Sequence, residues 1–404
     1  MTYSNTEGLE KLLNHTEFNV DIHPKPSQEK LLQLIPDYDG LLIRSEVKVT
    51  KEVIERSANL KLIVRAGTGV DNIDQTAATQ KGIVVANIPG GNTISATEHT
   101  IALLLALSRN IPQAHASLKS GNWEREKFTG TELQNKVLGL IGLGRIGKEV
   151  AKRALSFGMK VIAYDPYVTD EYAKSIGAEL KSLEEIYSQS DFISLHTPLN
   201  ESTKHLINKE SINKMKDGVR IINCARGGII DEKALYDGIK SGKIHSAALD
   251  VFEKEPLPKD SPLLELENIL LTPHLGASTE EAQIKIAQES SELIIDFFTK
   301  GIIRNAVNIP QVDLETFKNI KPYLDLSEKL GLFQGQIIEG RIKEIELIYG
   351  GEISNLNLSL VTLSYLKGLL TPILDIKVNF VNASYIAQER GIKIKESKVS
   401  FSED

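Results

Sequence analysis

Val137-Leu-Gly-Leu-Ile-Gly-Leu-Gly-Arg-Ile-Gly-Lys-Glu-Val150 is the stretch that decides the fold, because it joins an apolar strand to a helix through three glycines. Gly142 permits a tight turn, Gly144 lets the backbone approach a pyrophosphate, and Gly147 lets the helix pack closely on the strand. The unbonded N–H groups at the start of the helix then face the phosphates. The stretch therefore predicts a dinucleotide-binding unit.

An acidic residue follows at the spacing that such a unit requires. A second apolar run, residues 161–164, ends at Asp165, whose carboxylate can accept hydrogen bonds from the 2′- and 3′-hydroxyls of an adenosine ribose. The same charge repels a 2′-phosphate, and Pro166 and Tyr167 follow it without an arginine. A G-x-G-x-x-G pattern alone also occurs in chance loops, but the strand, the helix and the acid together predict NAD, rather than NADP, as the cofactor.

Size, charge and cysteine content exclude several classes of function. The 404 residues are too many for one compact core, so we expect two or three domains. A net charge of -7 attracts neither nucleic acid nor an anionic membrane. Cys224 is the only cysteine, so no internal disulfide can form and a cytoplasmic location is expected. His15, His99 and His205 lack ligand spacing, which predicts no metal site.

Short apolar runs that alternate with helix-like segments predict an α/β fold with a doubly wound parallel sheet of the Rossmann type. We expect this NAD domain, residues 97–282, to be inserted into a smaller flavodoxin-like α/β substrate-binding domain, residues 1–96 and 283–305. A partial α+β domain should follow over residues 316–404. Besides the strands named above, predicted strands cover residues 41–43, 62–64, 83–86, 192–195, 220–223, 247–249, 269–271 and 345–349.

Three polar clusters follow successive predicted strands at the edge of the sheet where a dinucleotide binds, and they contain Arg226, Glu255 and His274. Oxidation of a 2-hydroxy acid needs a cation to hold the carboxylate and a base to take the hydroxyl proton, and Arg226 and His274 fit these tasks. Glu255 would orient His274 and stabilise its charged form. Each residue alone is more often structural, and only their position along one sheet edge favours catalysis.

Other polar residues at strand ends suggest supporting roles. Cys224 is expected to be a small apolar filler beside the nicotinamide rather than a nucleophile, and His196 to line the cofactor wall. Arg44 and Arg65 end predicted strands of the first unit and could bind the far end of an anionic substrate, although each could equally be a structural ion pair.

Several runs resemble the NAD-dependent, D-isomer-specific 2-hydroxyacid dehydrogenases, and within them the members that act on D-3-phosphoglycerate. These runs are Ile43-Arg-Ser45, Arg65-Ala-Gly-Thr-Gly-Val-Asp-Asn-Ile-Asp74, Gly90-Gly-Asn-Thr-Ile-Ser-Ala-Thr-Glu-His99, and residues 141–147, 223–228, 250–252 and 272–279. The resemblance extends from about Leu9 nearly to the end. It implies oxidation of D-3-phosphoglycerate to 3-phosphohydroxypyruvate, the entry to serine synthesis.

The motifs and the resemblance together give the expected site. Arg226, Glu255 and His274 would be catalytic. A homodimer through the NAD domains is implied, with Trp123 and Arg125 reaching the neighbouring subunit, and a higher homo-oligomer stays open. Expected NAD contacts are Thr68, Gly142, Gly144, Arg145, Ile146, Gly147, Asp165, Thr197, Cys224, Ala225, Arg226, Asp250, His274, Leu275, Gly276 and Ala277, and expected substrate contacts are Arg44, Ser45, Arg65, Gly67, Gly69 and Arg125.

The chain departs from the family pattern at both ends. Family members begin with a strand of the type Lys-Val-Leu-Val-Ser-Asp, which has no counterpart here, so we expect the first sheet to lack an edge strand. Residues 325–404 resemble only the first part of the family's intervening regulatory domain, so serine feedback is not implied. Two other functions stay open: the same chemistry on glycerate, hydroxypyruvate or D-lactate, and a non-catalytic NAD(H)-sensing protein of the same fold.

Overall fold

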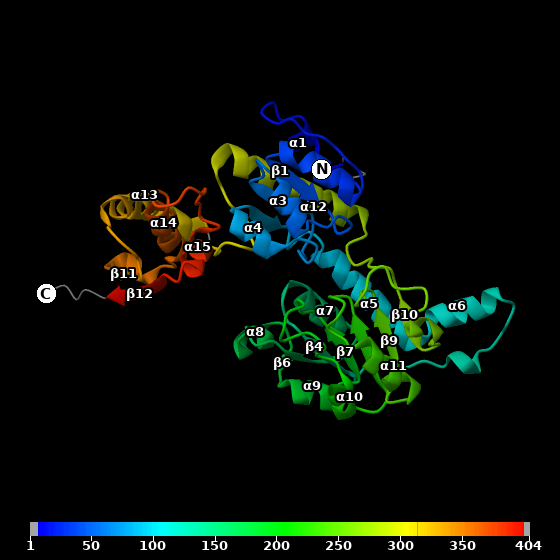
Figure 1. The fold of residues 1–404 in the computed structure, drawn as a ribbon. Helices are drawn as coiled ribbons and strands as arrows, with labels where there is room; N and C mark the ends of the chain where they lie inside the picture. The colour runs from blue at the N-terminus through cyan, green and yellow to red at the C-terminus, as the bar shows by residue number, and fades with distance from the viewer. Residues whose placement is uncertain (1–6, 313, 400–404) are drawn as a thin grey trace. The chain divides into compact units, whose positions relative to one another are not determined.

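The computed structural model describes residues 7–312 and 314–399 (Figure 1). Contacts within the chain group it into two compact units. The first unit combines the part up to Pro89 with the part from Ile284 onward, and the second unit is Gly90–Gln283. The chain thus leaves the first unit once and returns to it once.

The second unit is built on a seven-stranded parallel sheet, drawn largely in green in Figure 1. Its central strands are almost entirely apolar and buried, as expected for a parallel sheet that is covered on both faces. The strand order β10-β9-β8-β7-β4-β5-β6 reverses its direction between β4 and β7, which is where doubly wound sheets bind ligands. The strands are β4 (Val137–Ile141), β5 (Lys160–Tyr164), β6 (Glu179–Leu180), β7 (Phe192–Leu195), β8 (Val219–Asn223), β9 (Ile244–Leu249) and β10 (Ile269–Leu271).

Helices bury their apolar faces against this sheet. α5 (Thr93–Arg109) and α7 (Arg145–Ser156) share one core with β4 and β5, in which Leu104, Leu138 and Val150 are fully buried. A second core lies around Ile193 and Ile221 and receives α9 to α11. The remaining helices are α6 (Ile111–Lys119), α8 (Asp170–Ser175), α9 (Leu183–Gln189), α10 (Lys209–Lys214), α11 (Glu232–Lys240) and the short η2 (Glu126–Phe128) and η3 (Pro262–Glu265).

The first unit contains a smaller parallel sheet of order β1-β2-β3. Ile43 is in register with Arg65, so the carboxyl ends of these two strands lie side by side. Ile43, Ile63 and Val85 are fully buried in the core beneath the sheet. The elements are β1 (Gly40–Ile43), β2 (Leu62–Arg65), β3 (Val84–Asn87), α1 (Glu10–Leu13), α2 (Gln28–Leu34), η1 (Ile35–Asp37), α3 (Lys51–Arg56), α4 (Gln75–Lys81) and, from Ile284 onward, α12 (Glu280–Lys300).

In the carboxy-terminal part of the first unit, the helices α13 and α14 pack closely against each other. A Cβ atom on Gly331 would overlap the carbonyl oxygen of Tyr365, and one on Gly368 would overlap that of Glu328, so only glycine permits this approach of the two backbones. Beside the pair, β11 and β12 form a parallel ladder. The elements are α13 (Leu314–Ile337), β11 (Glu344–Gly350), η4 (Glu352–Asn355), α14 (Ser359–Leu370), α15 (Ala383–Glu389) and β12 (Lys393–Val399).

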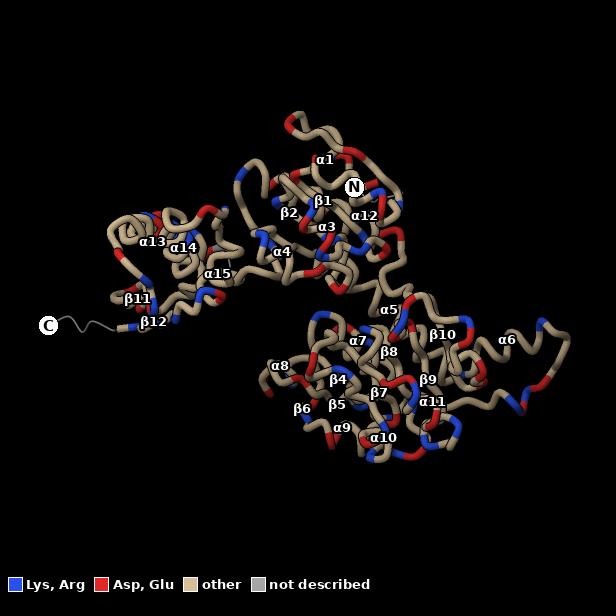
Figure 2. The backbone as a smooth tube through the Cα atoms, in the orientation of Figure 1, with Lys and Arg blue, Asp and Glu red and all other residues tan. Residues whose placement is uncertain are grey.

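Figure 2 shows Lys and Arg interspersed with Asp and Glu in both units. Within the described ranges, no helix combines the length and the apolar character needed to cross a membrane. The same ranges contain no group of three or more His, Cys, Asp or Glu side chains that could hold a metal ion.

Candidate active site

The glycine-rich turn between β4 and α7 leaves an open space at the start of the helix. Gly142 has a φ of 100°, and a Cβ there would lie 2.5 Å from the carbonyl oxygen of His196. A Cβ on Gly147 would overlap the carbonyl oxygen of Gly142. In contrast, a Cβ on Gly144 would meet no atom within 4 Å, and this residue gives the helix no capping side chain. The first N–H groups of α7 therefore point to a space that an anionic ligand can enter.

Gly144 and Gly147 give a matched pair of substitutions. Gly144→Ala should leave the free energy of unfolding within about 0.5 kcal/mol of the wild-type value, because the new methyl group meets only open space. It should nevertheless weaken NADH binding at least about tenfold, because the methyl group excludes a close phosphate. Gly147→Ala should destabilise the fold by about 1–3 kcal/mol through overpacking. Urea unfolding and NADH fluorescence titration measure both effects, and equal behaviour of the two variants would contradict the assignment.

Two further polar groups near this turn fit a bound dinucleotide. The Asp165 carboxylate accepts hydrogen bonds from the backbone N–H of Leu143 at 2.8 Å and of Tyr167 at 2.9 Å, which leaves lone pairs for ribose hydroxyls. The Oγ1 atom of Thr197, after β7, is buried without a hydrogen-bond partner within the described chain. A buried hydroxyl in this state is costly unless a ligand satisfies it. The residues present therefore fit NAD.

Burial sets the protonation of His196, which directly follows β7, and of Cys224, which directly follows β8. It lowers the pKa of His196 to about 4, so this imidazole is neutral at physiological pH and its Nε2 lies 2.9 Å from the hydroxyl of Ser194. Burial also raises the pKa of the Cys224 thiol to about 12, more than the hydrogen bond with Thr100 lowers it. Cys224 is consequently a protonated, inert thiol, which agrees with the expectation that it is no nucleophile.

His196 should make the stability of the protein depend on pH. Its pKa is depressed in the folded state relative to about 6.5 in the unfolded chain, so the unfolded state binds the additional proton as the pH falls. Stability is then lost between pH 6.5 and pH 4, with roughly 2 kcal/mol of the loss between pH 7 and pH 5. Urea unfolding at these two pH values should show a smaller drop for His196→Asn, which cannot titrate. An equal drop in both proteins would show that His196 is not the group responsible.

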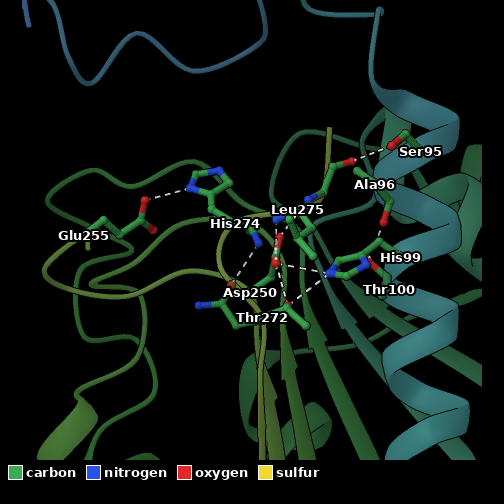
Figure 3. Close-up of polar contacts among 12 residues, drawn as sticks. Ser95, Ala96, His99, Thr100, Asp250, Glu255, Thr272, His274 and Leu275 are labelled. Atoms are coloured by element: carbon green, nitrogen blue, oxygen red, sulfur yellow. Dashed lines mark hydrogen bonds and ion pairs between the residues drawn. The ribbon is translucent and has the colours of Figure 1, made fainter. Parts of the chain in front are cut away.

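Glu255 and His274 form a hydrogen-bonded pair (Figure 3). Oε2 of Glu255, in the loop after β9, lies 2.7 Å from Nδ1 of His274, which follows β10. Burial alone would raise the pKa of Glu255, but the hydrogen bond from His274, with that from the backbone N–H of Phe252, outweighs burial and lowers it. Because the ionised carboxylate only accepts, Nδ1 carries the hydrogen and Nε2 is left available as a proton acceptor.

The loop after β8 carries Arg226 and is tied to the Glu255 loop through the backbone. The Asn223 side chain braces the loop by donating to the Arg226 carbonyl oxygen at 2.9 Å and accepting from the Ala225 N–H at 3.0 Å. The Arg226 guanidinium donates to the Ala225 carbonyl oxygen at 2.6 Å. A Cβ on Gly227 would overlap the carbonyl oxygen of Phe252, so these two loops pack backbone on backbone.

The structure thus brings most of the expected site residues to one edge of the second unit. The turn residues, Asp165 and Thr197 follow β4, β5 and β7. The three catalytic candidates follow β8, β9 and β10 together with the expected NAD contacts Cys224, Ala225, Asp250, Leu275, Gly276 and Ala277. Arg125 stands apart from them, in the exposed segment after α6.

The remaining expected residues lie in the first unit. Arg44 and Ser45 follow β1, and Asn72 fixes this turn by donating to the Arg44 carbonyl oxygen at 3.0 Å. Arg65 ends β2, and its guanidinium folds over Gly67, where a Cβ would overlap it. Gly67, Thr68 and Gly69 form the loop that follows. These residues share the carboxyl edge of the smaller sheet.

Sequence reasoning missed two residues of α5. Nε2 of His99 lies 3.1 Å from a carboxylate oxygen of Asp250 and 3.1 Å from Oγ1 of Thr272, and Ser95 donates to the carbonyl oxygen of Gly276 at 2.9 Å. Their spacing of four residues places both on one face of the helix, which is the only signal that the sequence offers.

Comparison with known families agrees with this geometry. Residues 101–276 match the family described as D-isomer specific 2-hydroxyacid dehydrogenase, NAD binding domain. Residues 319–404 match the D-3-phosphoglycerate dehydrogenase intervening domain.

Individual proteins show the same likeness. The chain is 50% identical over 382 residues to D-3-phosphoglycerate dehydrogenase of Methanocaldococcus jannaschii, covering 94% of this chain and 73% of that protein. It is 47% identical over 367 residues to the Bacillus subtilis protein of the same name, covering 91% of this chain and 69% of that protein. Among solved structures, D-lactate dehydrogenase from Aquifex aeolicus, complexed with NAD and lactic acid, matches with a TM-score of 0.67 and 33% identity. That match covers 75% of this chain and 95% of the other.

Proposed function

This chain belongs to the D-3-phosphoglycerate dehydrogenases, a family of NAD-dependent 2-hydroxyacid dehydrogenases, and from this premise we propose that it oxidises D-3-phosphoglycerate to 3-phosphohydroxypyruvate. The observation that carries the proposal is the 2.7 Å contact between Glu255 and His274, on the same sheet edge as the glycine-rich turn. A proton acceptor at that edge is what a hydroxy-acid dehydrogenase needs. We propose that the reaction is the first step of serine synthesis.

The roles of the three catalytic candidates follow from their chemistry. Arg226 binds the substrate carboxylate, for which a guanidinium offers two parallel N–H donors. His274 takes the proton of the C2 hydroxyl on Nε2, because Nδ1 is engaged with Glu255. Glu255 stabilises the imidazolium that results and fixes the ring orientation. Bound NAD supplies the acceptor for the hydride that leaves C2. In the reverse direction, His274 returns its proton to the carbonyl oxygen.

The remaining site residues are proposed as contacts. Gly144 and the first N–H groups of α7 would hold the pyrophosphate, and Asp165 would hold the ribose. The further proposed NAD contacts are Thr68, Gly142, Arg145, Ile146, Gly147, Thr197, Cys224, Ala225, Arg226, Asp250 and residues 274–277. The proposed substrate contacts are Arg44, Ser45, Arg65, Gly67, Gly69 and Arg125. We propose the same division into domains as above: residues 1–96 with 283–305, residues 97–282, and residues 316–404.

A direct assay tests the substrate. Purified protein is mixed with NAD, D-3-phosphoglycerate and a hydrazine trap that removes the carbonyl product, and NADH absorbance is followed. We expect NADH to accumulate. Turnover of D-lactate or glycerate, without turnover of D-3-phosphoglycerate, would assign another substrate within the family. NADH binding with no turnover of any of them would favour the sensing protein.

We further propose that the protein is a homodimer through its NAD domains. None of the nine residues of α6 is buried, and Ile111, Leu118 and Trp123 are 53%, 56% and 78% exposed. The same unit has a largely apolar hollow of about 380 Å³ lined by α5, α7 and Phe157. Exposed apolar patches of this kind mark interaction surfaces. Light scattering should give twice the chain mass, and Trp123→Ala should shift it toward the monomer, whereas a monomeric wild type would refute the dimer.

We also propose a cytoplasmic location. Cys224 is the only cysteine, so no disulfide can form within the chain. The relatives of the chain are metabolic enzymes by name. Fractionation of cells that express the chain with a tag tests this.

A further inference from the structure

The loop that carries His274 has a backbone conformation that requires support. His274 has a φ of 57°, which is uncommon for a residue with a Cβ and persists only where the surrounding structure fixes it. Its side chain is 42% exposed, so packing alone does not hold the ring. The orientation of the ring therefore depends on how residues 272–276 are anchored.

Asp250 is the first anchor of this loop (Figure 3). Its carboxylate, only 1% exposed, accepts from the hydroxyl of Thr272 at 2.6 Å and from the N–H groups of Leu275 at 2.7 Å and Gly276 at 2.8 Å. Burial would raise its pKa, but the hydrogen bonds from His99, Thr272 and Leu275 outweigh burial and lower it. The carboxylate is therefore ionised and acts only as an acceptor.

His99 of α5 completes this network. The Thr272 hydroxyl already spends its hydrogen on Asp250, and Asp250 has none, so Nε2 of His99 must carry the hydrogen that lies between them. The imidazole is thus a hydrogen-bond donor at Nε2. Because its side chain is only 18% exposed, water does not readily replace this donor.

Ser95 anchors the other end of the loop. One turn before His99 on the same face of α5, its buried hydroxyl donates to the carbonyl oxygen of Gly276 at 2.9 Å. The helix therefore contacts the loop on both sides of His274, at Thr272 through His99 and at Gly276 through Ser95.

We propose that Ser95 and His99 are positioning residues that clamp loop 272–276 to α5 and thereby hold His274 toward Glu255. The kinetic part of this inference rests on the proposed function. The clamp itself is a property of the folded protein and can be measured without substrate.

The test compares His99→Leu, which has no donor, with His99→Gln, which retains an N–H donor at a similar distance. Hydrogen exchange of the peptide that contains Leu275 and Gly276, whose amides donate to Asp250, should be at least about tenfold faster in His99→Leu and near wild type in His99→Gln. The kcat for D-3-phosphoglycerate should fall about 10- to 100-fold in His99→Leu with a smaller change in KM, and recover in His99→Gln.

A double-mutant cycle shows whether the effect passes through His274. In a His274→Asn background, His99→Leu should cause little further loss of kcat, because the group that it positions is already gone. Ser95→Ala should change loop exchange and kcat in the same direction as His99→Leu, but by less. Ser108→Ala is the matched control and should change neither. Ser108 is also buried on α5, but its hydroxyl donates within the helix to the Leu104 carbonyl oxygen.

Several outcomes would overturn the clamp. Exchange of the loop amides in His99→Leu within twofold of wild type would show that His99 does not hold the loop. Loss of kcat that is fully additive with His274→Asn would show that His99 acts elsewhere. A wild type without turnover would instead refute the proposed function, and the exchange comparison would still decide the clamp.

Discussion

Replacing Arg226 with alanine should lower kcat/KM for D-3-phosphoglycerate at least about 100-fold while NADH still binds with nearly wild-type affinity. The guanidinium is the only strong carboxylate donor in the loop after β8, and losing it releases the substrate from its reacting orientation. Steady-state kinetics and NADH fluorescence titration separate the two effects. Arg226→Lys should recover only part of the activity, because an ammonium group cannot form the two parallel hydrogen bonds.

The control for this substitution is Arg56→Ala. Arg56 is an exposed arginine at the end of α3, so its loss should leave both kcat/KM and NADH affinity unchanged. If Arg226→Ala retained turnover within a few fold of the wild type, the role given to Arg226 would be wrong.

His274→Asn should lower kcat by about 10²- to 10⁴-fold, the usual contribution of a general base. Asparagine is the suitable replacement because it tolerates the left-handed conformation that His274 adopts at φ 57°, so the loop should keep its backbone. The variant should also lose the acidic limb of the kcat/KM profile against pH, because its amide does not titrate. NADH affinity, by contrast, should change little.

His245→Asn is the matched control for this variant. His245 is an exposed histidine on β9, away from the carboxyl ends of the strands, and its replacement should change neither kcat nor the pH profile. An unchanged pH profile in His274→Asn would mean that another group takes the hydroxyl proton.

Most of the sheet could be predicted because its strands are continuous apolar runs between glycines and polar turns. Two strands were missed, for different reasons. β6, Glu179–Leu180, is too short for any pattern. β12, Lys393–Val399, has Ile394 and Val399 as its only apolar residues and is largely exposed. Its pairing with β11 arises from tertiary packing, which a local pattern does not record.

The residues of the candidate site also divide into those that the sequence pattern predicts and those that depend on tertiary packing. Arg226, Glu255 and His274 could be predicted because each follows a strand of one parallel sheet, and parallel strands end at a common edge. His99 could not, because a helix pattern shows which residues share a face and not what that face meets. The distances of 3.1 Å to Asp250 and Thr272 depend on residues more than 150 positions away in the chain. Only the packed structure brings them together.

The contact of Gly227 with the Phe252 carbonyl has a consequence for redesign of this enzyme. There is no room for even a methyl group between the loop after β8 and the loop after β9. The two loops therefore behave as one rigid block, and neither can be lengthened or mutated extensively on its own. Libraries that insert residues into only one of them should yield mostly misfolded chains. Libraries that vary both loops together should retain a far larger fraction of folded proteins.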